Sequence, residues 1–123
     1  MPDPVFNLIQ KQQAFARLIA SLITFAYAQG YKITLGEAYR TPEQAKWNAA
    51  HGLGIANSLH ISRLAMDFIV WKDGKMLTSF EDHKPLGEHW ESLSTPGLQC
   101  CWGGRFHSIV DSGHFSISHN GYK

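Results

Sequence analysis

Residues 58–67, SLHISRLAMD, place a histidine and an aspartate inside a largely apolar segment. Asp67 lies directly between two apolar residues, where its carboxylate is close to side chains that belong in a core. Burying a carboxylate is unfavourable unless a partner compensates its charge. A metal ion bound jointly with His60 is one such partner, and a salt bridge with Arg63 or Arg40 is another. The segment therefore predicts either a metal site or an ordinary ion pair.

The residues around Asp67 predict a strand that continues into a hairpin. Side chains alternate along a strand, so in a strand over 64–70 Asp67 lies on the face opposite to Leu64, Met66, Phe68 and Val70. Asp73-Gly74 then predicts a tight turn followed by a return strand. His60 precedes this strand in a glycine-containing loop. A turn in that loop would bring its imidazole back beside Asp67.

The rest of the chain predicts a mixture of helices and strands. Apolar residues at three- and four-residue steps predict a helix over 5–29 that Gly30 ends. Thr41 before Pro42 predicts the start of a short helix that ends near residue 51. Further segments predict a strand over 31–35, a short helix over 84–94, and extended segments over 98–106 and 113–118. With no internal repeat or linker, residues 1–123 predict a single α+β domain with an antiparallel sheet flanked by helices.

Composition limits the function classes. The chain has 123 residues, 44% of them hydrophobic, which suffices for one core, and its net charge of +1 argues against a nucleic-acid partner. The most apolar run, 18–31, carries no charge but is shorter than the roughly 20 residues that span a bilayer. No secretory signal is visible at the N-terminus. The adjacent residues Cys100 and Cys101 exclude a disulfide framework and predict reduced, partly buried thiols in a reducing compartment.

A second carboxylate–histidine pair lies in the segment DSGHF, where Asp111 precedes His114 by three residues. His114 opens the last predicted strand. If this strand and that of Asp67 lie side by side, His60, Asp67 and His114 converge. Two imidazoles and one carboxylate with an open fourth position describe a catalytic zinc site. The alternative is that Asp67 pairs with an arginine while both histidines bond only to the backbone.

Such a site also needs a base and a fixed cation. Asp111 would lie close enough to take a proton from a water activated by the metal without being a ligand itself. Arg40, at the end of a predicted strand, is the best candidate to anchor a substrate carboxylate or to stabilise an oxyanion. Trp102 is a candidate substrate contact because Gly103-Gly104 lets the backbone approach a ligand, although a core position is the commoner one for tryptophan.

Two other histidines lie in the segment EDHKPLGEHWE. His83 and His89 offer a conceivable second metal site. Their spacing, across a Pro-Leu-Gly segment that is expected to break a helix, favours solvated residues instead.

Four segments resemble the LAS group of zinc peptidases, which includes D-alanyl-D-alanine carboxypeptidases and L-alanyl-D-glutamate endopeptidases. SLHISRLAMDF resembles that family's Ser-x-His-x6-Asp motif. DSGHF resembles its second motif, an acidic residue three positions before the last histidine ligand. EAYRTPEQ resembles the stretch that carries a substrate-binding arginine, and CWGGRF resembles the Trp-Gly-Gly stretch before the second motif. The four occur in the family's order and cover about residues 31–117.

The resemblance implies a fold like that of Hedgehog and the D,D-peptidases, and it assigns roles to residues of this chain. It implies zinc ligands at His60, Asp67 and His114, and a general base at Asp111. It implies that Arg40 contacts the substrate or the transition state. Ser58 matches the motif's serine, which orients ligand or substrate; a plain turn residue is an equal alternative.

The implied activity is hydrolysis of a peptide bond in the stem peptide of peptidoglycan. An L-alanyl-D-glutamate endopeptidase acting as a phage or prophage lysis enzyme is favoured over a D-alanyl-D-alanine carboxypeptidase. A non-catalytic murein-binding or virion structural module of the same fold is the alternative from another class. We expect a monomer that collects in the host cytoplasm before lysis and then acts on the cell wall.

The chain departs from the family pattern at two positions. Arg63 stands where the family motif often has glycine, and it would be either a surface charge or a contact for an anionic substrate group. Asp111 stands where dipeptidases and many carboxypeptidases carry glutamate. Its side chain is one methylene shorter, so the pocket around it should be correspondingly tighter.

Overall fold

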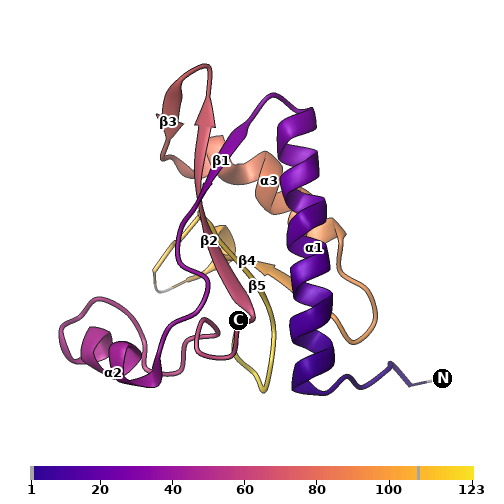
Figure 1. The fold of residues 1–123 in the computed structure, drawn as a ribbon, viewed down its shortest axis with the longest axis vertical. Helices are drawn as coiled ribbons and strands as arrows, with labels where there is room; N and C mark the ends of the chain where they lie inside the picture. The colour runs from indigo at the N-terminus through magenta and orange to yellow at the C-terminus, as the bar shows by residue number, and fades with distance from the viewer. Residues whose placement is uncertain (1, 108) are drawn as a thin grey trace.

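An antiparallel sheet with two helices packed on it forms the scaffold of the chain (Figure 1). The computed structural model describes residues 2–107 and 109–123. The helices are α1 (Leu8–Ala28), α2 (Pro42–Ala50) and α3 (Phe80–Ser92), with a short 3₁₀ helix over Gly103–Arg105. The strands are β1 (Lys32–Leu35), β2 (Ala65–Lys72), β3 (Lys75–Leu77), β4 (Cys100–Trp102) and β5 (His114–Ile117). The α+β fold predicted from the sequence is confirmed.

The strand order positions the two carboxylate–histidine segments side by side. The sheet runs β1-β2-β5-β4, β3 pairs with β2 beyond the end of β5, and every pairing is antiparallel. β5 comes after the other strands in the chain, yet it lies between β2 and β4. In the β2–β5 register Asp67 is directly opposite His114. Cross-strand neighbours on one face have Cβ atoms about 5 Å apart, so the two side chains must meet.

Alternation along β2 separates the core from the site. Phe68 and Val70 are buried, whereas Ile69 on the opposite face is 41% exposed. The predicted turn at Asp73-Gly74 joins β2 to β3, with both residues at positive φ (52° and 77°), as a type I′ turn requires.

The core lies between the sheet and helices α1 and α3, while α2 stands apart from both (Figure 1). The Trp90 ring of α3 lies 5.8 Å from that of Phe15 and 6.2 Å from that of Phe115. These contacts join both helices to β5. They therefore hold the strand that carries His114 from its core side.

Helix α1 begins later than its apolar repeat suggests. Asn7 caps it, and the Asn7 and Gln10 side chains each accept from the other's backbone N–H. This capping box makes Leu8 the first helical residue. Gly30 follows the last turn at a φ of 88°, which confirms its predicted role in ending the helix.

Helix α3 corrects the prediction of a short helix starting at residue 84. It starts at Phe80 behind the N-cap Ser79 and continues through Pro85. Pro85 is exposed and near the start of the helix, so only one early backbone hydrogen bond is lost. Gly87 does not break the helix. It lies against the Trp102 indole, where a Cβ would overlap the ring, so packing accounts for the glycine at this position.

The two cysteines lie in β4 as free, buried thiols. Burial raises the pKa of Cys100 to about 11, which keeps it protonated and unreactive at neutral pH. Within residues 2–107 and 109–123, no helix combines the length and apolarity that crossing a membrane requires.

Candidate metal centre and active site

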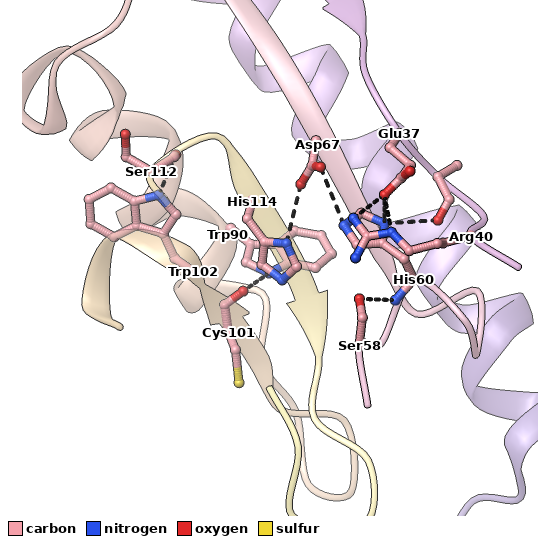
Figure 2. Close-up of polar contacts among 11 residues, drawn as sticks. Glu37, Arg40, Ser58, His60, Asp67, Trp90, Cys101, Trp102, Ser112 and His114 are labelled. Atoms are coloured by element: carbon pink, nitrogen blue, oxygen red, sulfur yellow. Dashed lines mark hydrogen bonds and ion pairs between the residues drawn. The ribbon is translucent and has the colours of Figure 1, made fainter. Parts of the chain in front are cut away.

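Three side chains from separate parts of the chain meet beside the sheet (Figure 2). His60 lies in the turn before β2, Asp67 points out of β2, and His114 is the first residue of β5. One potential ligand atom from each lies within 4.8 Å of the other two. The convergence expected from the sequence is therefore present in the structure, and it follows from the β2–β5 register together with the turn at residues 58–64.

Asp67 joins the two imidazoles. Its Oδ2 atom is 3.3 Å from Nε2 of His60, and its Oδ1 atom is 3.2 Å from Nδ1 of His114. Among the described residues it makes no ion pair with Arg40 or Arg63. The alternative of an arginine salt bridge is therefore wrong.

The backbone beside the site sets the tautomer of His60. Its Nδ1 lies 3.0 Å from the carbonyl oxygen of Ala38, which can only accept, so Nδ1 carries the proton of the neutral ring. Nε2 then presents a lone pair toward Asp67. A metal-binding histidine commonly donates its other N–H to such a carbonyl.

The pKa values show how strongly these groups interact. Burial alone would lower the pKa of His60, but the hydrogen bond and charge of Asp67 and the Ala38 carbonyl outweigh it, so the pKa is raised. Burial alone would raise the pKa of Asp67, but hydrogen bonds and charge from His114 and His60 reverse this and lower it strongly. The cluster therefore holds the negative charge of Asp67 between two imidazole rings.

This donor set fits a divalent metal ion. Zinc binds both imidazole nitrogens, which are borderline donors, and carboxylate oxygens, which are hard donors, and a structural zinc site would need a fourth protein ligand. No fourth histidine, cysteine or acidic side chain joins the cluster among the described residues. The arrangement thus leaves a coordination position for water or substrate, as in catalytic sites.

Asp111 and Arg40 line the same pocket as the three candidate ligands, a hollow of about 220 Å³. Asp111 is exposed, but partial burial of its carboxyl group and then the negative charge of Asp67 raise its pKa. A raised pKa makes the carboxylate of Asp111 a stronger base than that of an ordinary aspartate. Arg40 is largely buried, its side chain being 14% exposed.

Glu37 holds Arg40 in place, and sequence analysis missed it. The Glu37 carboxylate accepts from Nε of Arg40 at 2.8 Å and also pairs with Nη2. It lies 3.9 Å from Nδ1 of His60 (Figure 2). The three-residue spacing between Glu37 and Arg40 was the available signal, but in a loop this spacing does not by itself bring two side chains together.

Ser58 and Arg63 belong to the turn that presents His60. Ser58 lines the pocket, and its Oγ accepts from the His60 backbone N–H at 3.1 Å, so it shapes the turn whether or not it touches a substrate. Arg63 has a φ of 56°, a conformation that glycine, the residue often found here in the resembled motif, adopts without strain. Its guanidinium lies over the Tyr39 ring at 4.0 Å rather than in the pocket.

Trp102 does not line the pocket. The residue is 1% exposed, its ring stacks with Phe80 and packs against Gly87, and its Nε1 donates to the Ser112 carbonyl at 2.8 Å. This burial contradicts the predicted substrate contact, since the core already covers the ring.

The prediction of solvated residues is wrong for His83, which is 6% exposed and makes two hydrogen bonds. His89 stacks on Phe25, with 3.7 Å between the ring centroids. No second group of metal-binding side chains occurs within the described ranges.

The pocket also has an apolar wall that sequence analysis did not find. Phe106 lies with its ring 5.4 Å from that of His114. The remaining newly identified lining residues come from loops and the C-terminal segment and are Leu53, Gly54, Ile55, Leu59, Ile109 and Lys123. Loop residues carry no periodic signal, so their convergence is visible only in the folded chain.

No protein-family profile and no curated protein sequence matches the chain, but solved structures do. The L-Ala D-Glu endopeptidase ChiX of Serratia marcescens superposes with a TM-score of 0.65 at 15% identity, covering 86% of this chain and 79% of that one. A mutant of the vancomycin resistance D,D-pentapeptidase VanY from the VanB-type resistance cassette, in complex with Zn(II), superposes with a TM-score of 0.54 at 17% identity. That match covers 85% of this chain and 70% of VanY.

The chain has the fold of these two peptidases. At these identities the likeness concerns the fold alone. The roles of individual residues in this chain therefore depend on the geometry of its own pocket.

Proposed function

We propose that the chain is a zinc-dependent peptidase that hydrolyses a bond in the stem peptide of peptidoglycan. The observation that carries this proposal is the His60–Asp67–His114 cluster, open on one side to a pocket that Asp111 and Arg40 also line. The fold supports it, since structures with this fold include an L-Ala D-Glu endopeptidase and a D,D-pentapeptidase in complex with Zn(II).

The residues divide the chemistry among them. A zinc ion held by the cluster would polarise the scissile carbonyl and acidify a water. Asp111 accepts the proton of the attacking water and passes it to the leaving nitrogen. Arg40, kept in place by Glu37, donates to a substrate carboxylate or to the developing oxyanion.

An L-alanyl-D-glutamate endopeptidase is the specific activity we propose, because the ChiX match has the higher TM-score and covers more of both chains. The VanY match supports D,D-peptidase activity as the second candidate. Mass spectrometry of muropeptides released from purified murein separates the two, since new termini appear at different stem positions. A role in phage or prophage lysis is proposed on the motif resemblance, and lysis of cells that export the protein to the periplasm would test it.

The first test separates metal ligands from the base. We expect His60→Ala and His114→Ala to lose both zinc, measured by atomic absorption, and murein hydrolysis. Asp111→Asn should keep zinc and lose turnover by a factor of about 10²–10⁴, the usual contribution of a general base.

A fully active Asp111→Asn protein with a full complement of zinc would refute the base assignment. Hydrolysis that survives exhaustive chelation would refute the zinc assignment. Binding to murein without release of new amino termini, by zinc-loaded wild-type protein, would instead favour a non-catalytic module.

A further inference from the structure

Backbone contacts anchor the loop that carries Asp111 and His114. The Asp111 N–H donates to the Gly103 carbonyl at 3.0 Å, and the Gly113 carbonyl accepts from the Phe68 N–H at 2.8 Å. The loop closes on itself through the His114 N–H, which donates to the Asp111 carbonyl at 3.1 Å. These bonds fix both ends of the loop and leave its middle residue to be held by other means.

Ser112, the middle residue, is held by side chains on two elements. Its carbonyl accepts from Nε1 of Trp102 at 2.8 Å. Its hydroxyl lies 2.7 Å from Nδ1 of His83 in the first turn of α3. The other ring nitrogen of His83, Nε2, lies 2.9 Å from the Leu77 carbonyl. The imidazole thus bridges the end of β3 to the loop that carries the proposed base.

The Leu77 carbonyl decides the direction of these bonds. A carbonyl oxygen only accepts, so Nε2 of His83 must carry the proton. In the neutral ring Nδ1 then has a lone pair, and the Ser112 hydroxyl donates to it. Histidine is suited to this position because one planar ring supplies a donor on one side and an acceptor on the other.

The His83–Ser112 contact matters for catalysis because Ser112 lies between the proposed base and a candidate metal ligand in the sequence. Ser112 directly follows Asp111 and lies two residues before His114, so a rotation of its backbone displaces the base, the metal ligand, or both. Displacing a reacting group by about 1 Å can reduce the rate about 10²-fold. Asp111 is exposed, so packing of its own side chain does little to hold it.

We propose that His83 is a positioning residue, which acts through the Ser112 hydroxyl to hold Asp111 and His114 in productive geometry. This inference rests on the proposed function, and it adds a residue that touches neither substrate nor metal. A histidine that served only the core would stabilise the fold without tuning turnover in the folded, zinc-loaded enzyme.

Paired variants separate the two bonds of the ring. Asparagine places its oxygen near Nδ1, so His83→Asn keeps an acceptor for Ser112, whereas His83→Gln places its nitrogen near Nε2 and keeps only the donor to Leu77. Ser112→Ala removes the hydroxyl, and Ser112→Thr retains it. His89→Gln is the matched control, because His89 lies on the same helix and stacks on Phe25 away from the pocket.

We expect Ser112→Ala and His83→Gln each to lower kcat by about tenfold or more in zinc-loaded protein, with KM and zinc content unchanged. The double variant should lose no more than either single variant, because both remove the same bond. Ser112→Thr and His83→Asn should recover most of the activity, and His89→Gln should match the wild type.

Amide hydrogen exchange supplies a readout independent of activity. The Asp111 and His114 amides should exchange about tenfold faster or more in Ser112→Ala and His83→Gln than in the wild type and the His89→Gln control. Unchanged exchange together with unchanged kcat would overturn the inference, as would single-variant losses that multiply in the double variant. If the wild type does not cleave murein, the proposed function fails, and exchange alone decides whether His83 holds the loop.

Discussion

At the scale of single residues, the position of Asp67 in its strand determines both its partner and the direction of its side chain. Its place in β2 sets it opposite His114, and its face of the strand directs its carboxylate away from the core. A slip of one residue in the β2–β5 pairing would turn the carboxylate into the apolar interior, where burying it unpaired is prohibitive. The site therefore depends on strand register as much as on residue identity.

Arg40 should matter through its charge and its shape together. We expect Arg40→Ala to lower kcat/KM by about 10²–10³, the effect of removing one oxyanion donor, with zinc content unchanged. The kcat/KM of Arg40→Lys should lie between those of the wild type and Arg40→Ala, because lysine keeps the charge but lacks the planar guanidinium group that pairs with Glu37. Steady-state kinetics on a synthetic stem peptide would measure both. The exposed Lys46→Ala is the control, and equal losses in Lys46→Ala and Arg40→Ala would contradict a specific role.

At the scale of elements, the packing contact between α3 and β4, where Gly87 meets Trp102, leaves no room for a larger side chain. Replacing a mid-helix glycine by alanine normally stabilises a protein by about 1 kcal/mol. Here we expect Gly87→Ala to destabilise it by about 1–3 kcal/mol, because the new Cβ would overlap the Trp102 indole. Urea unfolding would measure the difference. The exposed neighbour Glu88→Ala should stay within about 0.5 kcal/mol of the wild type, and a stabilised Gly87→Ala would contradict the packing account.

Local sequence signals predicted most elements well. The caps at Thr41 and Gly30 and the Asp73-Gly74 turn act within a few residues, and each is found where expected. Local rules failed at α3, where Pro85 and Gly87 predict a break. There the packing of Trp102 against the helix outweighs the intrinsic preference of the two residues.

The residues of the candidate site also include some that the sequence predicted and some that it did not. His60, Asp67 and His114 carried recognisable spacing, and strand pairing brings them together. Glu37 had only its three-residue spacing to Arg40, which does not pair side chains in a loop, and His83 acts through a contact with a distant segment. Trp102 was misassigned because a glycine pair beside a tryptophan suits a binding surface and a tightly packed joint equally well.

At the scale of the whole molecule, the cluster should make the stability of the metal-free protein depend on pH. Asp67 has a pKa below its ordinary 3.8, so its contribution is present above that value and lost as pH falls through the folded pKa. His60 has a pKa above its ordinary 6.5, so its contribution is present below that value and lost as pH rises through the folded pKa. The stabilising contributions of Asp67 and His60 are therefore both fully present between pH 3.8 and pH 6.5.

Calorimetry in chelator should therefore show the highest Tm within that window, and Asp67→Asn should flatten the profile on both sides. Adding zinc near neutral pH should raise the wild-type Tm, because only the folded state brings the ligands together. A Tm of metal-free wild-type protein that keeps rising well above pH 6.5 would contradict this account of His60.

The position of β5 between β2 and β4 has a consequence for assembly. β5, the last strand in the sequence, must pair with both β2 and β4, which precede it. Pairings between residues far apart in the sequence form slowly. Until these pairings form, His60 and Asp67 lack His114, and no partly folded form has a complete set of donors. Capture of a coloured divalent probe such as cobalt would then report the moment when the sheet closes, because the candidate metal centre stays incomplete until β5 is paired.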